Sequence, residues 1–242
     1  MKDKSILVVS AHAADFVWRG GGTIAKYIKN GAKVSLVILS YGSRGESNDL
    51  WKQENQTLEN VKKIRLSEIE KAAEIIGVED MEMWDYQDYP MHLDSEERLE
   101  RLVKKIREVK PDHIISHSFG DAFNPDHPKV AHFVHQASVM SVSKGVQIEG
   151  YDNVKQMSIF GFEPHQSEIS DFKPDVIIDI TETFEIKKAA MECFKAQNHL
   201  IEYYADRAKM RGNHARRISG VKSYKFAEAF TRVYPYVGGE FV

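Results

Sequence analysis

The sequence predicts an α/β protein with a mostly parallel β-sheet and helices on both faces of that sheet. Two observations support this prediction. Short apolar runs, such as residues 5–9, show no polar alternation, which is typical of strands covered on both faces. These runs alternate along the chain with longer segments of helical character, the pattern of a parallel sheet with crossover helices. We therefore expect a single domain spanning residues 1–242.

The expected elements follow from apolar runs and from the residues that end them. Gly31, Gly77 and Gly212 are helix stop signals, and Pro111 ends a fourth helix. The strands are expected at 5–9, 34–39, 81–84, 112–117, 156–161, 176–180 and, as a final strand or edge segment, 224–230. The helices are expected at 23–30, 58–76, 96–109, 129–142 and 184–211.

Composition excludes several classes of function. The net charge is −3 and acidic and basic residues are interleaved, which argues against a nucleic-acid-binding surface. No apolar stretch resembles a signal peptide or a membrane span, so we expect a cytoplasmic protein that does not bind membranes. A single cysteine, Cys193, excludes a disulfide within the chain and is interpreted as a packed thiol.

A histidine and an aspartate follow the first predicted strand. His12 and Asp15 lie three residues apart, where the carboxyl edge of a parallel sheet places its ligands. Imidazole nitrogen and carboxylate oxygen are good ligands for Zn²⁺ or a similar divalent cation. The alternative is that His12 caps a turn and Asp15 caps the following helix. A catalytic zinc site has three protein ligands, so the metal hypothesis needs one more.

Other polar loops follow later strands and should converge on the same edge. Arg44 and Glu46 lie in a glycine-bearing loop after the second strand, and the alternative for them is a solvated loop with a chance ion pair. Further members of this predicted pocket are Asp88, His127 and His165. For the third ligand, His127 precedes a predicted helix, whereas His132 and His135 fall inside that helix and His117 stays close to its strand.

Residues 11–15, Ala-His-Ala-Ala-Asp, resemble the Ala-His-Pro-Asp-Asp signature of the PIG-L/LmbE superfamily. Its members are zinc-dependent N-acetylglucosamine deacetylases and their relatives. The resemblance covers nearly the whole chain, and it implies a Rossmann-like three-layer sandwich. Its other matches are Gly-Gly-Thr at 21–23, Arg-Gly-Glu at 44–46, Arg65 to Glu68, Asp88, Asp-His at 126–127 and Ala-Glu-Ala-Phe at 227–230.

The resemblance implies that the zinc ligands are His12, Asp15 and His127. One departure bears on the chemistry. The deacetylases use the first Asp of their signature as the general base, and that position is Ala14 here. Loss of a general base costs roughly 10²–10⁴ in rate, so the chain is expected to keep the metal and run other chemistry. Two further departures are Ala13, where the family has Pro, and Asn124, where a His is common.

Longer motifs resemble the 4-oxalomesaconate hydratase branch of the superfamily. They are Ser10 to Arg19, Arg44 to Ser47, Asp88 to Pro90, Phe162 to Gln166, and Asn198 to Tyr204. This resemblance implies a zinc lyase that adds water across a C=C bond of an unsaturated oxo-tricarboxylate such as 4-oxalomesaconate. Family members commonly form closed rings, so a homo-oligomer is expected.

Roles for the remaining residues follow as hypotheses. Glu46 is the expected base, and His165 is the expected second proton-transfer group because imidazole titrates near neutral pH. The alternative for His165 is a histidine hydrogen-bonded in its loop. Arg19 and Arg44 are expected to bind substrate carboxylates. Further candidates, or else a solvated basic face, are Arg207, Arg211, Arg216 and Arg217.

Two carboxylates are expected to support the ligands rather than bind the metal. Asp126 should orient a ligand histidine, and Asp88 should do the same or serve as a turn residue. The competing enzyme class is a zinc-dependent deacetylase in which Glu46 or another acid replaces the missing Asp. A third reading is a non-catalytic module that uses the metal for folding or ligand binding.

Overall fold

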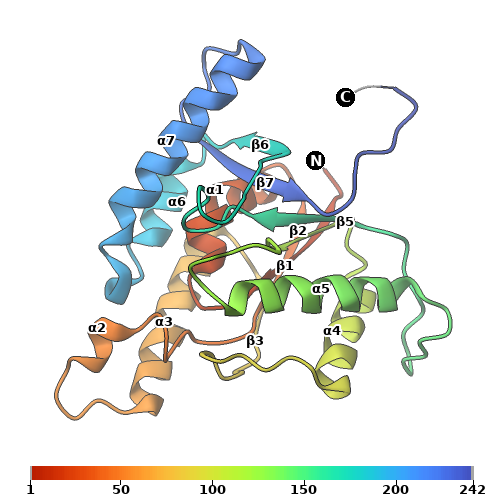
Figure 1. Ribbon diagram of the computed structural model, residues 1–242, viewed down its shortest axis with the longest axis horizontal. Helices are drawn as coiled ribbons and strands as arrows, with labels where there is room; N and C mark the ends of the chain where they lie inside the picture. Colours follow the sequence, from red (N-terminus) through yellow and green to blue (C-terminus); the bar gives the residue numbers. More distant parts are fainter. Residues whose placement is uncertain (1, 241–242) are drawn as a thin grey trace.

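The computed structural model describes residues 2–240 and contains one seven-stranded sheet of order β3-β2-β1-β4-β5-β7-β6 (Figure 1). β1 to β5 are parallel, and β7 runs antiparallel to both of its neighbours, β5 and β6. The predicted α/β fold with a mostly parallel sheet is confirmed. The strands are β1 (Ser5–Ser10), β2 (Lys33–Ile38), β3 (Asp80–Met83), β4 (His113–His117), β5 (Ser158–Phe162), β6 (Val176–Asp179) and β7 (Ala227–Arg232).

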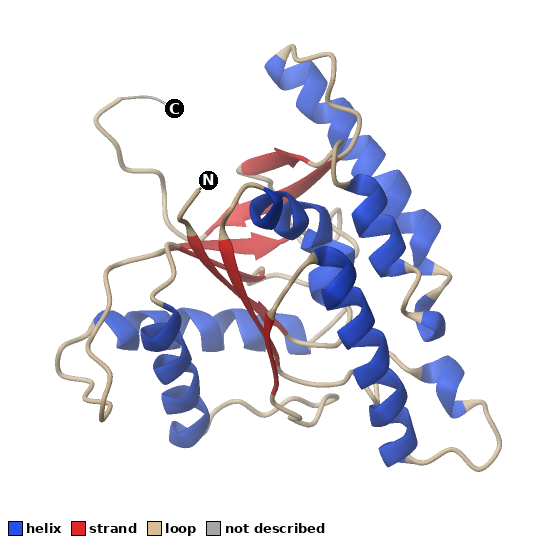
Figure 2. Ribbon diagram, turned by 180° about the vertical axis from the view of Figure 1, so that it is seen from behind, coloured by secondary structure: helices blue, strands red, loops and turns tan. Residues whose placement is uncertain are grey.

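Helices cover both faces of the sheet, as the views from opposite sides show (Figures 1 and 2). Alternate residues of β1 enter different apolar cores: Ile6 and Val8 pack on one face, Leu7 and Val9 on the other. Such alternation is what a strand buried on both faces requires. The first core is shared with α1 (Asp15–Lys29), α3 (Leu58–Ile76), α6 (Phe184–Met191) and α7 (Leu200–Ser219), and the second with α4 (Glu96–Val109) and α5 (Asp126–Val142).

The first helix starts eight residues before its predicted start at residue 23 and runs through three glycines. Glycine is unfavourable in the interior of a helix, but at Gly20 and Gly22 there is no room for a side chain. A Cβ on Gly20 would lie 2.7 Å from the Phe162 ring, and one on Gly22 would lie 2.5 Å from Ile180. Close packing of α1 on the sheet therefore requires glycine and overrides its low helix propensity. This correction places Asp15 in the first turn of α1.

The predicted helix at 184–211 is interrupted and continues past its expected end. It consists of α6, a short 3₁₀ turn (Lys195–Gln197) and α7, which runs to Ser219. Gly212 does not end α7. A Cβ at Gly212 would collide with the backbone carbonyl of Lys225, so glycine is needed there for close approach of two chain segments. Two smaller differences are α2 (Asn48–Trp51), which was not predicted, and α5, which starts at Asp126 instead of residue 129.

Within residues 2–240, no helix combines the length and apolar character needed to cross a membrane.

Candidate metal centre and active site

The turn between β1 and α1 brings His12 and Asp15 together. The Asp15 carboxylate accepts the backbone N–H of His12 at 2.9 Å and lies 3.2 Å from its Nδ1 atom. The Ser10 hydroxyl donates to the His12 carbonyl at 2.8 Å, which closes the turn. Both His12 and Asp15 are almost fully buried. The short His-to-Asp spacing therefore places two metal-binding atoms side by side in a fixed turn.

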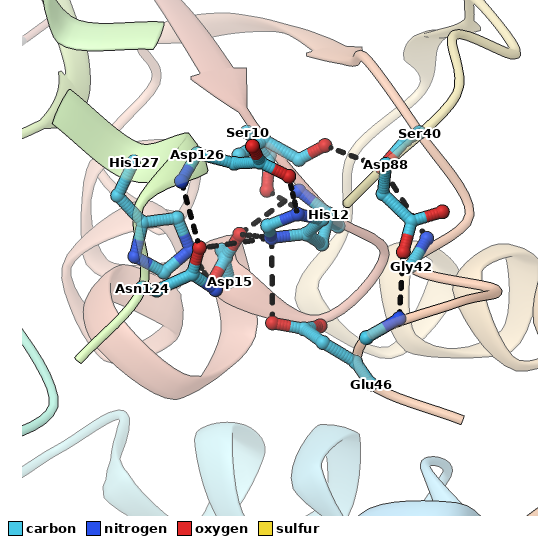
Figure 3. Close-up of polar contacts among 12 residues, drawn as sticks. Ser10, His12, Asp15, Ser40, Gly42, Glu46, Asp88, Asn124, Asp126 and His127 are labelled. Carbon is cyan, nitrogen blue, oxygen red and sulfur yellow. Dashed lines mark hydrogen bonds and ion pairs between the residues drawn. The ribbon is translucent and has the colours of Figure 1, made fainter. Parts of the chain in front are cut away.

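Two more side chains converge on this pair, as Figure 3 shows. The Nε2 atom of His127, in the first turn of α5, lies 3.2 Å from His12 Nδ1 and 3.3 Å from the Asp15 carboxylate. The Glu46 carboxylate lies 3.3 Å from His12 Nδ1. One ligand atom from each of these four residues falls within 4.8 Å of the others. The predicted convergence of loops at the carboxyl edge of the sheet thus occurs in the structure.

A carboxylate lies behind each of the two histidines, on the side of the ring away from the cluster. Asp121, which the sequence reasoning missed, lies 2.8 Å from His127 Nδ1, so Nε2 is the atom presented to the cluster. Asp126 lies 3.6 Å from His12 Nε2, on the side of the ring away from Asp15 and Glu46. His117 stacks on His127 at 4.1 Å, and its Nε2 accepts the backbone N–H of Ala11.

Asp88 holds the loop that carries Glu46. Its carboxylate accepts the backbone N–H groups of Arg44 and Gly45 at 2.9 and 2.8 Å, and the Ser43 hydroxyl at 3.2 Å. Asp88 is therefore a loop-anchoring residue and is not among the four clustered side chains. Glu46 itself is largely buried, and burial raises the pKa of its carboxyl above the ordinary value. Its Oε2 atom is buried and has no hydrogen-bond partner among the described residues.

The charges around the cluster fit a divalent cation. Four carboxylates surround it: Asp15, Glu46, Asp121 and Asp126. Among residues 2–240, the permanent cations in contact with these carboxylates are Arg19, which lies 3.3 Å from Asp15 and 3.6 Å from Asp121, and Lys129, which lies 3.2 Å from Asp126. Burial of the ring opposes protonation of His12, but the carboxylates of Glu46, Asp126 and Asp15 hold its pKa well above the ordinary value. A divalent ion bound at His12 Nδ1 would take the place of that proton and offset the excess negative charge. Two imidazoles and two carboxylates also form a donor set suited to such an ion.

Position 14 offers no proton acceptor. Ala14 precedes α1 directly, is fully buried and belongs to the apolar core of that face of the sheet. The first turn of α1 therefore presents one carboxylate, Asp15, to the cluster. Of the side chains within the cluster, only Glu46 provides a second carboxylate.

A cavity of about 360 Å³ adjoins the cluster. Its lining includes Asp15, Arg19, Glu46, His165 and Tyr204. The Arg44 side chain is exposed and does not line this cavity, which differs from the prediction for it. The reason is local: Asp88 binds the backbone of residues 44 and 45, and the following residue, Glu46, is the one turned inward.

Burial lowers the pKa of His165 to about 4, and the positive charges of Arg19 and Arg207 add to this effect. His165 is therefore uncharged near pH 7, unlike the readily titrating imidazole expected from the sequence. Of the four arginines named as further candidates for substrate binding, two form ion pairs with the residue two positions before His165. Arg207 and Arg211 both bind the Glu163 carboxylate. The other two, Arg216 and Arg217, are exposed near the end of α7.

Comparisons with known proteins place the chain among relatives of known family. The model of the family PIG-L, GlcNAc-PI de-N-acetylase, matches residues 7–138. The chain is 41% identical over 237 residues to "4-oxalmesaconate hydratase" of Pseudomonas putida, covering 97% of this chain and 91% of that protein. A probable N-acetyl-alpha-D-glucosaminyl L-malate deacetylase 2 of Bacillus anthracis is 28% identical over 136 residues, covering 56% and 59% of the two chains.

The crystal structure of GalB, the 4-carboxy-2-hydroxymuconate hydratase from Pseudomonas putida KT2440, has the same fold throughout. It superposes with a TM-score of 0.93 at 40% identity and covers 100% of both chains. The family model and the relative that spans nearly the full length point to the same assignment. The chain belongs to the PIG-L family.

Proposed function

We propose that the protein is a zinc-dependent hydratase that adds water to a C=C bond of an unsaturated oxo-tricarboxylate such as 4-oxalomesaconate. The observation that carries this proposal is that position 14 is an alanine while Glu46 places a carboxylate at the cluster. The position that serves as base in the related deacetylases holds no carboxylate, while a carboxylate from another loop faces the cluster. The near-full-length similarity to a hydratase supports the choice of reaction.

His12, Asp15 and His127 would hold the metal, through His12 Nδ1, the Asp15 carboxylate and His127 Nε2. When bound, zinc or another divalent ion supplies a Lewis acid that stabilises negative charge on a substrate oxygen. Asp121 would keep the His127 ring oriented for this task through its contact with Nδ1, and Asp126, 3.6 Å from His12 Nε2, is the proposed partner of the other ring.

Glu46 is the proposed base for the water molecule. Because burial raises the pKa of its carboxyl, Glu46 binds a proton more tightly than an exposed glutamate does. In hydration the water oxygen bonds to one alkene carbon, and the water proton passes to the Glu46 carboxylate. The electron pair of the C=C bond moves toward the conjugated carbonyl oxygen.

His165 is proposed to exchange the second proton, at the neighbouring carbon. The neutral ring accepts that proton in the dehydration direction and returns it in the hydration direction. Substrate carboxylates would offset the charges of Arg19 and Arg207, which favours the protonated ring in the bound state. Arg19 lines the cavity and is the proposed contact for one carboxylate.

The partner is thus proposed to be a small polycarboxylate, with neither nucleic acid nor a membrane surface involved. A homo-oligomeric assembly and a cytoplasmic location remain predictions. Size-exclusion chromatography with light scattering tests the first of these directly.

Replacing Asp121 with asparagine should weaken metal binding by about 10- to 100-fold, because the carboxylate that orients His127 loses its charge. Isothermal titration with Zn²⁺ measures the change. Asp171→Asn, on an exposed turn, is the matched control. Equal affinities for Asp121→Asn and the wild type would show that His127 does not bind the metal through Nε2.

Incubation of the zinc-loaded protein with 4-oxalomesaconate tests the function. We expect loss of the ultraviolet absorbance of the conjugated enol form and appearance of the hydrated tricarboxylate by NMR. Parallel incubation with N-acetylglucosamine derivatives tests the competing deacetylase activity by release of free amine. Amine release without hydration would overturn the proposal and favour the deacetylase.

A further inference from the structure

His165 is held by α7 through two adjacent tyrosines. The Tyr204 hydroxyl lies 3.3 Å from the ring atom Nδ1, and among residues 2–240 this is the one hydrogen bond that the ring makes. Tyr204 is 4% exposed, and both side chains line the active-site cavity. The Tyr204 ring stacks on Trp18 at 5.4 Å, which fixes the position of the hydroxyl.

Tyr203 holds the same residue in a different way. Its hydroxyl donates to the backbone carbonyl of His165, and Arg207 donates to that carbonyl at 2.7 Å. The Tyr203 ring stacks on the imidazole with centroids 4.5 Å apart. One tyrosine therefore fixes the backbone and the ring plane, and the other binds a ring nitrogen.

We propose that Tyr204 is a positioning residue for the second proton transfer: its hydroxyl engages Nδ1 of His165, so that Nε2 is the atom that exchanges a proton with the substrate carbon. This inference rests on the proposed function. A histidine that transfers protons needs one ring nitrogen held so that the other is presented in a defined tautomer and orientation. Nε2 makes no hydrogen bond to any described residue, so it remains available.

A hydroxyl suits this position better than a carboxylate would. When Nε2 exchanges the proton, Nδ1 keeps its own proton in both the neutral ring and the imidazolium, and the Tyr204 oxygen accepts a hydrogen bond from Nδ1 in both states. A carboxylate there would favour the imidazolium and raise the pKa of His165. Apart from burial, the charges that act on the pKa of His165 are those of Arg19, Arg207, Asp121 and His199, and the titratable groups in contact with the ring are Tyr203 and Tyr204. In the protein without substrate, burial and positive charge therefore keep the ring neutral, and Tyr204 orients the ring without adding a charge beside it.

The first test does not depend on activity. In ¹⁵N-histidine-labelled protein, the His165 signals are assigned by their absence in His165→Asn. We expect one dominant tautomer in the wild type and in Tyr203→Phe, which keeps the ring contact. We expect a mixture of both tautomers in Tyr204→Phe. Unchanged His165 nitrogen shifts in Tyr204→Phe would overturn the proposal, whether or not the protein is a hydratase.

The second test separates positioning from general stability. Tyr204→Phe should lower kcat roughly 10- to 100-fold and change KM by less than about threefold, since a misplaced proton-transfer group slows chemistry more than binding. The same change should have no further effect in a His165→Asn background, because Tyr204 acts through His165. A full additive loss in that background would overturn the proposal. Wild-type hydration by His165→Asn would instead refute the role of His165 in the proposed function.

Discussion

Glu46→Gln should lose about 10²–10⁴-fold in hydration rate, because glutamine cannot take the proton of the attacking water. The variant keeps the size and hydrogen-bonding shape of the side chain, and the neighbouring groups His12, Asp15 and His127 are untouched. Stopped-flow absorbance with the tricarboxylate substrate measures the rate, and metal analysis after dialysis measures the zinc content. We expect zinc close to one equivalent per chain.

Glu54→Gln is the matched control, since Glu54 is exposed and lies outside the residues that line the cavity. Two outcomes would contradict the role of Glu46. A wild-type rate in Glu46→Gln would place the base elsewhere. Loss of zinc together with activity would make Glu46 a metal ligand, which its position 3.3 Å from His12 Nδ1 permits.

Asp15→Ala should abolish stable metal binding. Asp15 contacts both histidines of the cluster, at 3.2 Å from His12 Nδ1 and 3.3 Å from His127 Nε2. Loss of an outer partner of a ligand costs about 10–100-fold in affinity, so loss of the ligand itself should cost more. Hydration should fall to background along with the metal. The measurement is zinc content by mass spectrometry and affinity by competition with a chelating dye.

Asp15→Asn serves as the folding control for this prediction. Asparagine retains an oxygen for the backbone N–H of His12, which Asp15 binds at 2.9 Å, but lacks the charge that pairs with Arg19. We expect Asp15→Asn to unfold at a temperature nearer to the wild type than Asp15→Ala and still to bind zinc weakly. A full equivalent of tightly bound zinc in Asp15→Ala would contradict the ligand assignment.

Local sequence patterns predicted the regular elements well where packing is conventional. The helices predicted at 58–76 and 96–109 match α3 and α4 residue for residue. Their amphipathic periodicity and the stop signals that end them, Gly77 and Pro111, are local features of the sequence. The prediction failed at Gly20 to Gly22 and at Gly212. There the close approach of Phe162, Ile180 and the Lys225 backbone determines the structure, and these partners lie far away in the sequence.

The same distinction applies to the site. The rule that loops converge at the carboxyl edge of a parallel sheet predicted that His12, Asp15, Glu46 and His127 lie together. The rule does not identify side chains that contact the site histidines from other parts of the fold. Asp121 reaches His127 from the opposite side of the ring, and Tyr204 reaches His165 from a helix that begins 35 residues further along the chain.

The sequence by itself determined the chemistry that is available: an imidazole and a carboxylate after the first strand, an alanine at position 14 and a glutamate after the second strand. The tertiary structure alone decided that Asp121 and Tyr204 contact the histidines of the site, that Arg44 stays outside the cavity and that His165 is uncharged. The physical reason is that residue type is a local property. Distance, burial and pKa depend on strand order and on packing between segments far apart in the chain.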